Sequence, residues 1–376
     1  MIYIVVLSII TFSYFSYYAY IKLSYPFWSL QPVPSSIPFC CSTKEIIDEK
    51  TLQVEKYIKL LDVYTYDISN CDNQKLNYFF NFFQRHSLFS LFDYNPEGKE
   101  MKTSLTGYSF PVYMSTFLAM PLLESMSAIA SVPVFVSVFD RTTLSHAVKY
   151  LALDKGYKKE ENLKYLLQTH MFNVREKCKN IYTFLYRKRN GVNIVTPLCV
   201  VTDTHYTNNA LNGIIHFKNE DPTIKLISIT EESFILFSSF LKDSLDNYSL
   251  VVHAEKKHLL HMISNDIYKV FVITENNVIH GCFIFSVLDE KLYLHASIKI
   301  IDNEKIFFNC FITAIRRLNR KYTFSKIIIN NTTSNDFLNI ALRIVYVPLI
   351  KKETFHYILH NYSYKYISPE NAFILY

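Results

Sequence analysis

Glycine is scarce in this chain, with only 6 among 376 residues, while tyrosine and phenylalanine number 29 and 30. That bias is typical of an AT-rich genome and suggests a viral source. Half of the residues are hydrophobic, which excludes an intrinsically disordered chain. A chain of this length is too long for one small core and can form two packed halves.

Long basic blocks are also missing. Lysine and arginine number 39 against 33 aspartates and glutamates, and the resulting net charge of +6 is spread along the chain. Nucleic-acid-binding domains concentrate positive charge on one face or along one helix. The charge pattern therefore argues against nucleic acid as a partner.

Cysteine pairs at metal-ligand spacing are absent as well. The 7 cysteines form no Cys-x-x-Cys motif, and an odd count without such spacing indicates free thiols in a reducing compartment. His253, His258 and His261 are close in sequence, but no carboxylate or cysteine stands at ligand spacing from them. We therefore expect no metal site and interpret these histidines as the polar face of a helix.

Charged residues are missing from residues 1–21, and Lys22 ends this apolar run. About twenty apolar residues span a bilayer. A secretory signal would have a basic beginning and small residues before a cleavage site, and neither is clear here. We therefore expect an uncleaved anchor over residues 1–22. Lys22 gives only a slight bias to the orientation, and we expect the domain to lie on the cytosolic side of a cellular or virion membrane.

A proline-rich arm, residues 23–43, follows the anchor, with prolines at positions 26, 32, 34 and 38. Such a segment is extended and lacks regular structure. Two interpretations stay open. The arm is either a plain linker or a segment that folds back onto the domain through Phe27 and Trp28, the single tryptophan of the chain.

Hydrophobic periodicity predicts a mixed α/β fold. Helices are expected at 44–61, 75–92, 160–180, 231–245, 304–320 and 336–345, and strands at 108–118, 127–139, 148–153, 181–186, 269–274, 278–288, 291–300 and 326–330. Strands, a helix and a strand therefore occur in this order twice, and the polar stretch 203–212 reads as the join. We expect two halves, 44–205 and 206–376, each with a central mixed sheet flanked by helices.

The strand at 148–153 leads through a short basic turn into the helix at 160–180. Free backbone N–H groups and the helix dipole make such a turn a natural site for an anion. The sequence thus predicts an anion site, although the first helical turn also carries Glu160 and Glu161, which oppose a phosphate.

Four motifs resemble those of one enzyme family. Residues 27–33 read Phe-Trp-Ser-Leu-Gln-Pro-Val, residues 92–97 read Phe-Asp-Tyr-Asn-Pro-Glu, residues 127–129 read Ser-Ala-Ile, and residues 356–362 read His-Tyr-Ile-Leu-His-Asn-Tyr. In this order they resemble motifs of N-myristoyltransferase, of the GNAT-like superfamily of acyl-CoA N-acyltransferases, over residues 25–376. The resemblance implies two tandem GNAT-like halves, with acyl-CoA on the first and a peptide on the second.

The resemblance also implies roles for particular residues. Backbone N–H groups of Tyr150 and Leu151 would form the oxyanion hole, and the strand segment Tyr150, Leu151, Ala152 and Leu153 would line the acyl-CoA site. Phe27 and Trp28 would cover the coenzyme. Lys158 and Lys159 stand in the turn that binds its phosphates in the family. Myristoyl-CoA or another acyl-CoA would be the co-substrate.

In the family the terminal carboxylate accepts the proton of the attacking amine, and this chain ends at Tyr376 after three apolar residues. Burial would raise the pKa of such a carboxylate toward that of a base at neutral pH. The acidic residue that faces the peptide in the family is replaced by Lys352. The expected partners are proteins or peptides with an N-terminal glycine.

Three functions stay open from the sequence. The chain is an N-myristoyltransferase-like enzyme, a non-catalytic membrane-anchored binding or structural protein that keeps this fold, or another acyl-CoA-dependent N-acyltransferase. A Ser/His/Asp or Cys/His signature is absent, which agrees with acyl transfer that needs no side-chain nucleophile. An open apolar groove between the strand at 113–123 and the central helix would favour the enzyme, and a groove filled by Phe or Tyr the non-catalytic protein.

Overall fold

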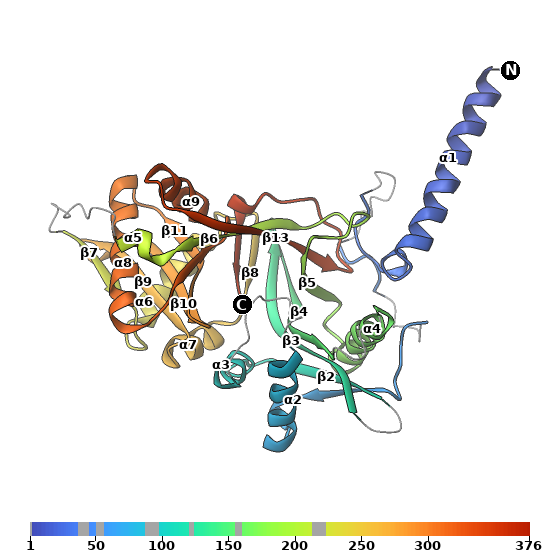
Figure 1. The fold of residues 1–376 in the computed structure, drawn as a ribbon, viewed down its shortest axis with the longest axis horizontal. Coiled ribbons are helices and arrows are strands. Elements are labelled where there is room, and N and C mark those ends of the chain that lie inside the picture. Colours follow the sequence, from blue (N-terminus) through green and yellow to red (C-terminus); the bar gives the residue numbers. More distant parts are fainter. Residues whose placement is uncertain are drawn as a thin grey trace.

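The structure, a computed structural model, describes residues 2–36, 45–49, 56–86, 98–119, 124–154, 160–212 and 223–376. One long helix, α1 (Ile2–Ser24), projects from a body built around an extended sheet, and the C-terminal end lies in the middle of that body (Figure 1). By length and composition α1 is apolar enough to cross a membrane. Of its residues only Ile21 is buried, so the helix adds little to the core.

Within the described residues, fourteen strands form one mixed sheet. They are β1 (Val63–Asp67), β2 (Tyr113–Ala119), β3 (Glu124–Val138), β4 (Arg141–Leu153), β5 (Thr183–Arg189), β6 (Cys199–Thr207), β7 (Ile224–Ser228), β8 (Leu250–His253), β9 (Tyr268–Glu275), β10 (Val278–Leu288), β11 (Lys291–Lys299), β12 (Lys326–Ile329), β13 (Leu349–His360) and β14 (Ala372–Leu375). The pairs β4–β5, β11–β12 and β8–β14 are parallel, and the remaining pairs are antiparallel.

The main path of the sheet has the strand order β1-β2-β3-β4-β5-β13-β6-β12-β11-β10-β9-β7. Strands from the first part of the chain form one side of the sheet, and strands from the second part form the other. At its centre two strands are exchanged. The late strand β13 pairs with the early strand β5, and the early strand β6 pairs with the late strand β12. The expectation of a join at 203–212 is therefore wrong for its first part, because β6 runs through it. The domain boundary at 205 and 206 stays a prediction.

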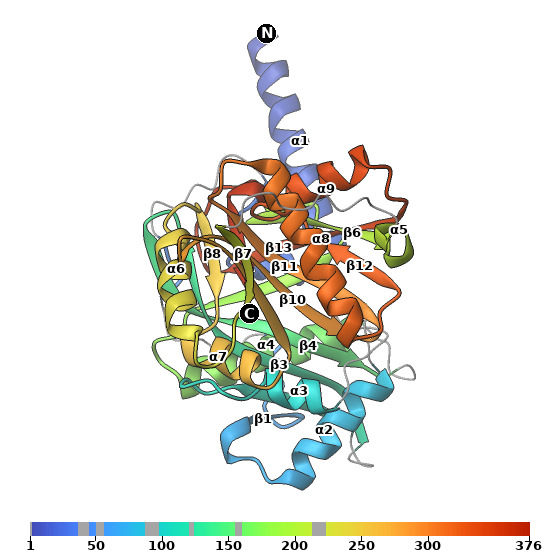
Figure 2. The same cartoon turned by 90° about the vertical axis from the view of Figure 1, so that its left-hand side faces the viewer.

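Helices cover both faces of the sheet. They are α2 (Asn73–His86), α3 (Gly98–Ser104), α4 (Glu160–Lys177), α5 (Asn208–Asn212), α6 (Phe234–Leu245), α7 (Lys256–Ser264), α8 (Glu304–Lys321) and α9 (Asn335–Ile344). In the first half α2 and α3 pack on one face and α4 on the other. In the second half α6 and α7 pack opposite α8, as Figure 2 shows. The fold is thus a three-layer α/β structure.

Local sequence signals explain several of these elements. The hairpin between β9 and β10 turns at Asn276 and Asn277, whose φ angles of 50° and 65° are left-handed and suit asparagine. Helix α8 begins at Asn303, whose side chain accepts a hydrogen bond from the N–H of Ile306. The same helix buries Phe307, Phe311, Ile315 and Leu318 on one face, as its periodicity predicts.

Three expectations are corrected. Residues 45–49 and 56–61 are not helical, so the helix expected at 44–61 does not form over the described part of that range. The strand expected at 108–118 begins only at Tyr113. Finally, the three neighbouring histidines do not form one polar face. His253 lies on β8, and His258 on α7 is buried and stacks on Tyr108 at 3.8 Å between ring centroids.

A buried polar chain links α4 to the sheet beneath it. The His170 ring bonds to Ser115 at 2.7 Å and to Ser131 at 2.8 Å, and Ser131 bonds to the His146 ring at 2.9 Å. Burial lowers the pKa of His146 and His170 to about 3. Both rings are therefore neutral in the folded protein at neutral pH.

We expect the protein to lose stability as the pH falls below about 6.5. Below that pH the histidines of the unfolded chain become protonated, whereas the buried rings of His146 and His170 stay neutral in the folded protein. The cost is about 2 kcal/mol per histidine at pH 5. Urea denaturation between pH 7 and pH 5 measures it, and the variant His146→Asn should give a shallower fall. A free energy of unfolding that stays constant over this range would contradict the assignment.

Candidate active site

Strands β4 and β5 separate in the middle of the sheet. They pair only over Ser145–Ala147, while β5 continues to pair with β13 as far as Arg189. The register between β3 and β4 shifts here, because Ser131 pairs with Val148 and Ala130 pairs with Tyr150. Lys149 is thus the extra residue of a β-bulge, a feature that bends a strand and redirects its side chains.

The bulge interrupts the regular alternation by which successive side chains of β4 face opposite sides of the sheet. Val148 and Leu151 pack toward α4, whereas Tyr150 and Ala152 pack toward α2. Lys149 and Tyr150, although consecutive, both line one central cavity. The bulge therefore turns two neighbouring side chains of β4 toward that cavity and leaves backbone of β4 unpaired with β5.

The central cavity has a volume of about 120 Å³ and lies where strands of both halves meet. Its polar lining includes Ser104, Lys149, Tyr150, Arg187, Asp203, His295, Asn330 and Tyr376. The Tyr150 hydroxyl bonds to the Ser104 hydroxyl at 2.6 Å. Burial raises the pKa of the Tyr376 phenol well above its ordinary value, so this ring is neutral. Glu100 lines the cavity as well, so the cavity combines one lysine, an ion pair, a further carboxylate and several hydroxyl groups.

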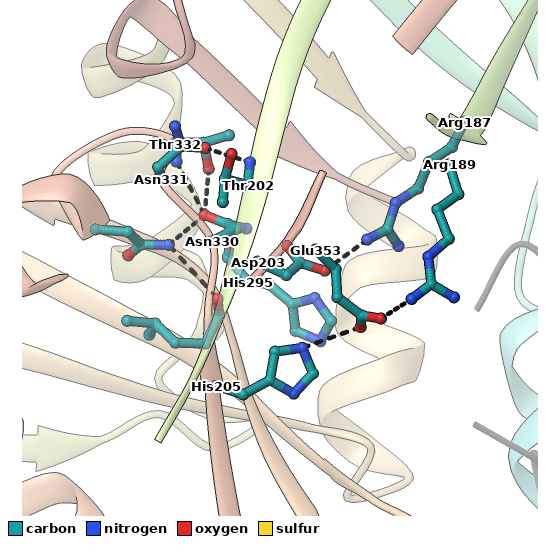
Figure 3. A network of polar contacts seen from close by, with 12 residues as sticks. Arg187, Arg189, Thr202, Asp203, His205, His295, Asn330, Asn331, Thr332 and Glu353 are labelled. Carbon is teal, nitrogen blue, oxygen red and sulfur yellow. Dashed lines mark hydrogen bonds and ion pairs between the residues drawn. The ribbon is translucent and has the colours of Figure 1, made fainter. Parts of the chain in front are cut away.

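One wall of the cavity is a buried ion pair. Arg187 on β5 donates to Asp203 on β6 at 2.7 Å, across the inserted strand β13, and both side chains are largely buried (Figure 3). The guanidinium also lies over the Phe355 ring, 3.8 Å from its centroid. Arg187 is therefore fixed on two sides and is held rigidly against the cavity.

A second carboxylate lies beside this pair. Glu353 on β13 is almost fully buried and pairs with Arg189 and, at 3.1 Å, with His205 (Figure 3). It also pairs with Lys351 at 3.1 Å. Lys352, which the motif resemblance aligned with an acidic position, is exposed, whereas the next residue, Glu353, is buried. The sequence analysis did not single out Glu353.

Asparagine side chains fix the end of β12 beside the cavity. Asn330 donates to the His295 carbonyl at 2.9 Å and accepts from the N–H of Thr332 at 3.0 Å, and Asn331 accepts from the N–H of Thr202 at 2.7 Å (Figure 3). These contacts connect β6, β11 and β12 around the cavity. Asn330 and Asn331 each stand in an Asn-x-Thr motif of the kind that can be glycosylated, but here their side chains form hydrogen bonds within the protein.

A second, polar pocket of about 290 Å³ lies at the foot of α1. The arm residues Phe27 and Trp28 line it together with Lys164 on α4 and Lys188 on β5. The Trp28 ring contacts Phe27 and Tyr186 at centroid distances of 5.5 and 6.4 Å. This part of the arm is therefore packed on the domain and is not a free linker.

The arm also meets the C-terminal motif. The Gln31 side chain donates to Gln168 on α4 at 2.9 Å and contacts the His360 ring at 3.1 Å, and the Pro32 carbonyl accepts from Asn361. Two of the four motifs that carry the family resemblance are thus in direct contact, although they stand at opposite ends of the sequence.

The predicted site residues fall into two groups. Tyr150 and Tyr376 line the central cavity, whereas Phe27 and Leu151 belong to a core cluster on the α4 side, with Trp28 packed against it. Ala152 and Leu153 continue β4, and Ala152 packs on the opposite face, toward α2.

Lys158 and Lys159 lie outside the described residues, as do the side chain of Glu160 and residues 92–97. The phosphate-binding role of this turn therefore stays a prediction from the sequence. Sequence reasoning missed Lys149, whose only signal was one charged residue inside an apolar run.

Comparison with solved structures places the fold. Two crystal structures of Saccharomyces cerevisiae N-myristoyltransferase with bound myristoyl-CoA superpose with TM-scores of 0.68 and 0.69. They are 14% and 15% identical, over 92% of this chain in each case, and over 94% and 90% of theirs. An Enterococcus faecalis protein of unknown function, described as a probable N-acyltransferase, matches with a TM-score of 0.50 at 8% identity, over 79% of this chain and 72% of its own. No family model and no curated protein sequence matches the chain.

The likeness covers nearly the whole of both chains. Over more than nine-tenths of its length, this chain has the fold of N-myristoyltransferase.

Proposed function

We propose that the protein is an acyl-CoA-dependent N-acyltransferase that transfers a fatty acyl group to the N-terminal glycine amine of a protein. The observation that carries this proposal is the separation of β4 from β5 at the Lys149 bulge, beside a cavity that Tyr376 also lines. An open strand edge next to a cavity can offer backbone N–H groups to an oxyanion.

In the proposed reaction the acceptor amine attacks the carbonyl carbon of the thioester. The C–N bond forms, the C–S bond breaks, and the thiolate of coenzyme A leaves. Backbone N–H groups of Tyr150 and Leu151 stabilise the oxyanion of the tetrahedral intermediate. A carboxylate at Tyr376 accepts the proton that the amine loses. No side-chain nucleophile takes part.

For the coenzyme, we propose the pocket at the foot of α1. Its two lysines, Lys164 and Lys188, offer positive charge for phosphate groups, and the ring of Trp28 offers an apolar surface. Lys158 and Lys159 are further proposed phosphate partners. We also propose that α1 anchors the enzyme to a membrane, since it is long and apolar enough to span one and Ile21 is its only buried residue among those described.

Binding of acyl-CoA is expected to change the fluorescence of Trp28, the single tryptophan of the chain. Titration of the full chain in detergent with acyl-CoA, followed by tryptophan emission, measures the affinity. Changing both Lys164 and Lys188 to Met should weaken it about 3- to 10-fold at low salt and less at high salt.

Lys242→Met, on the distant helix α6, is the matched control and should bind as the wild type does. Equal affinity of the double variant and the wild type would remove the pocket from the proposal.

One observation favours a second candidate function. The space between β2 and α4 is occupied by aromatic rings, with Phe117 6.3 Å and Tyr57 6.1 Å from Tyr165 between centroids. Rings in this position favour a non-catalytic protein that keeps the fold, or an N-acyltransferase with a short acyl donor.

Assays with acyl-CoA chains from two to fourteen carbons separate the three functions. Transfer from long donors indicates the fatty acyltransferase, transfer from short donors only indicates the short-chain enzyme, and no transfer indicates the non-catalytic protein.

A further inference from the structure

Lys149 is a buried amine for which the structure gives no partner within the described residues. Only 5% of the residue is exposed, and no hydrogen bond to Nζ is present in the part of the chain that the structure describes. Its side chain lines the central cavity. Burial lowers the pKa of Lys149 to about 7. An amine in this state is costly to keep in a protein interior, because burial removes its charge from bulk solvent.

The other charged groups around the cavity already have partners. Arg187 pairs with Asp203 at 2.7 Å. The His295 ring bonds to the Ser286 hydroxyl at 2.7 Å, and burial lowers its pKa to about 3, so it brings no charge. Glu100, which also lines the cavity, interacts electrostatically with Lys269. The terminal carboxylate of Tyr376 is assigned to the proton of the acceptor amine, so none of these negative groups is assigned to Lys149, whose pKa shift is caused by burial alone.

The position of Lys149 is set by the bulge. It directly precedes Tyr150, whose backbone N–H is proposed to hold the oxyanion, and both side chains line the same cavity. An acceptor amine that attacks beside this N–H must approach to about 3–3.5 Å from the carbonyl carbon. The atoms bonded to that amine then lie within the cavity that Lys149 lines. At about 120 Å³ the cavity admits a few such atoms and little more.

We propose that the ammonium group of Lys149 binds a carboxylate that the acceptor carries close to its reactive amine. This inference rests on the proposed N-acyl transfer and names its acceptor class. The carboxylate has two sources: the α-carboxylate of a free amino acid, or an acidic side chain directly after an N-terminal glycine. Its binding would supply a counter-charge and hold the amine beside the bulge.

The test compares charged and neutral acceptors of equal shape. The probes are free glycine against glycinamide, and the dipeptide amides Gly-Asp against Gly-Asn. Binding to the full chain is measured by ligand-observed NMR, with and without a non-hydrolysable acyl-CoA. We expect one charged probe to bind roughly 10-fold or more tightly than its neutral counterpart. Preference for glycine identifies an amino-acid acceptor, and preference for Gly-Asp identifies a peptide.

The variant Lys149→Met keeps the length of the side chain and removes its charge. It should bind charged and neutral probes equally and should unfold at the same or a higher temperature, because a buried unpaired amine is lost. Lys269→Met is the control: Lys269 is partly buried and pairs with Asp266, but it does not line the cavity, so the preference should remain.

Three results would overturn the proposal. These are no preference for the charged probes in the wild type, no binding of any charged probe at millimolar concentration, or a clear loss of stability in Lys149→Met. The last would mean that Lys149 serves an internal ion pair. Failure of the enzyme proposal looks different: no acyl transfer to any acceptor, with the charge preference intact.

Discussion

Replacing the carboxylate of Tyr376 by an amide is expected to lower the rate of acyl transfer roughly 100-fold or more, which is the usual loss when a general base is removed. Tyr376 lines the central cavity together with Tyr150, and the strand that carries it, β14, is buried and pairs with β8. Semisynthesis of the last residues gives the amide without a change of shape. Single-turnover kinetics with saturating acyl-CoA then measure the chemical step.

The fold should survive this change, since Phe373, Ile374 and Leu375 remain packed in the core. A terminus extended by a few residues is a second version, in which both the charge and the free volume of the cavity change. Full activity of the amidated chain would show that a different group takes the proton. In that case the neutral form of Lys149 is the first candidate, because burial lowers its pKa to about 7.

Removing one partner of the Arg187–Asp203 pair is expected to destabilise the protein by about 3–5 kcal/mol, because a buried charge is then left without its counter-ion. Both side chains are more than four-fifths buried, and they connect β5 to β6 across β13. The variant Asp203→Ala makes this change. Guanidinium denaturation, followed by circular dichroism, gives the free energy of unfolding.

The double variant Arg187→Met, Asp203→Leu is the control, since it removes both charges and fills the space with apolar atoms. We expect it to recover most of the stability that Asp203→Ala loses. By contrast, Lys351→Ala removes one exposed partner of Glu353 and should cost less than about 1 kcal/mol. A loss of similar size in the single and double variants would contradict this account, because removing both charges would then recover nothing.

Local patterns predicted much of the fold. The strand β3, the helices α4 and α8 and the turn at Asn276 and Asn277 each depend on residues close in sequence, whose periodicity or backbone preference decides the structure. The helix expected at 44–61 failed where distant contacts override local preference. Within that range, Ile46 forms an isolated bridge with Tyr362, near the end of the chain.

Strand exchange could not be predicted in the same way. Whether β13 pairs with β5 or with β12 depends on contacts between residues far apart in sequence, and the hydrophobic pattern of β13 is the same in both arrangements. The site shows the same limit. Tyr150 and Tyr376 could be named from the family resemblance. Lys149 and Glu353 gain meaning only when a bulge and a neighbouring strand are known.

The exchange of strands at the centre of the sheet affects folding during synthesis on the ribosome. Phe184 on β5 is synthesised long before its pairing partner, His360 on β13. At about 5–20 residues per second, synthesis of the chain between these two residues takes roughly 10–35 seconds. The pairing of β5 with β13 cannot form before then. During this time one edge of β5 is open to pairing with other chains, a state in which nascent proteins aggregate. We therefore expect the growing chain to depend on a chaperone during this interval.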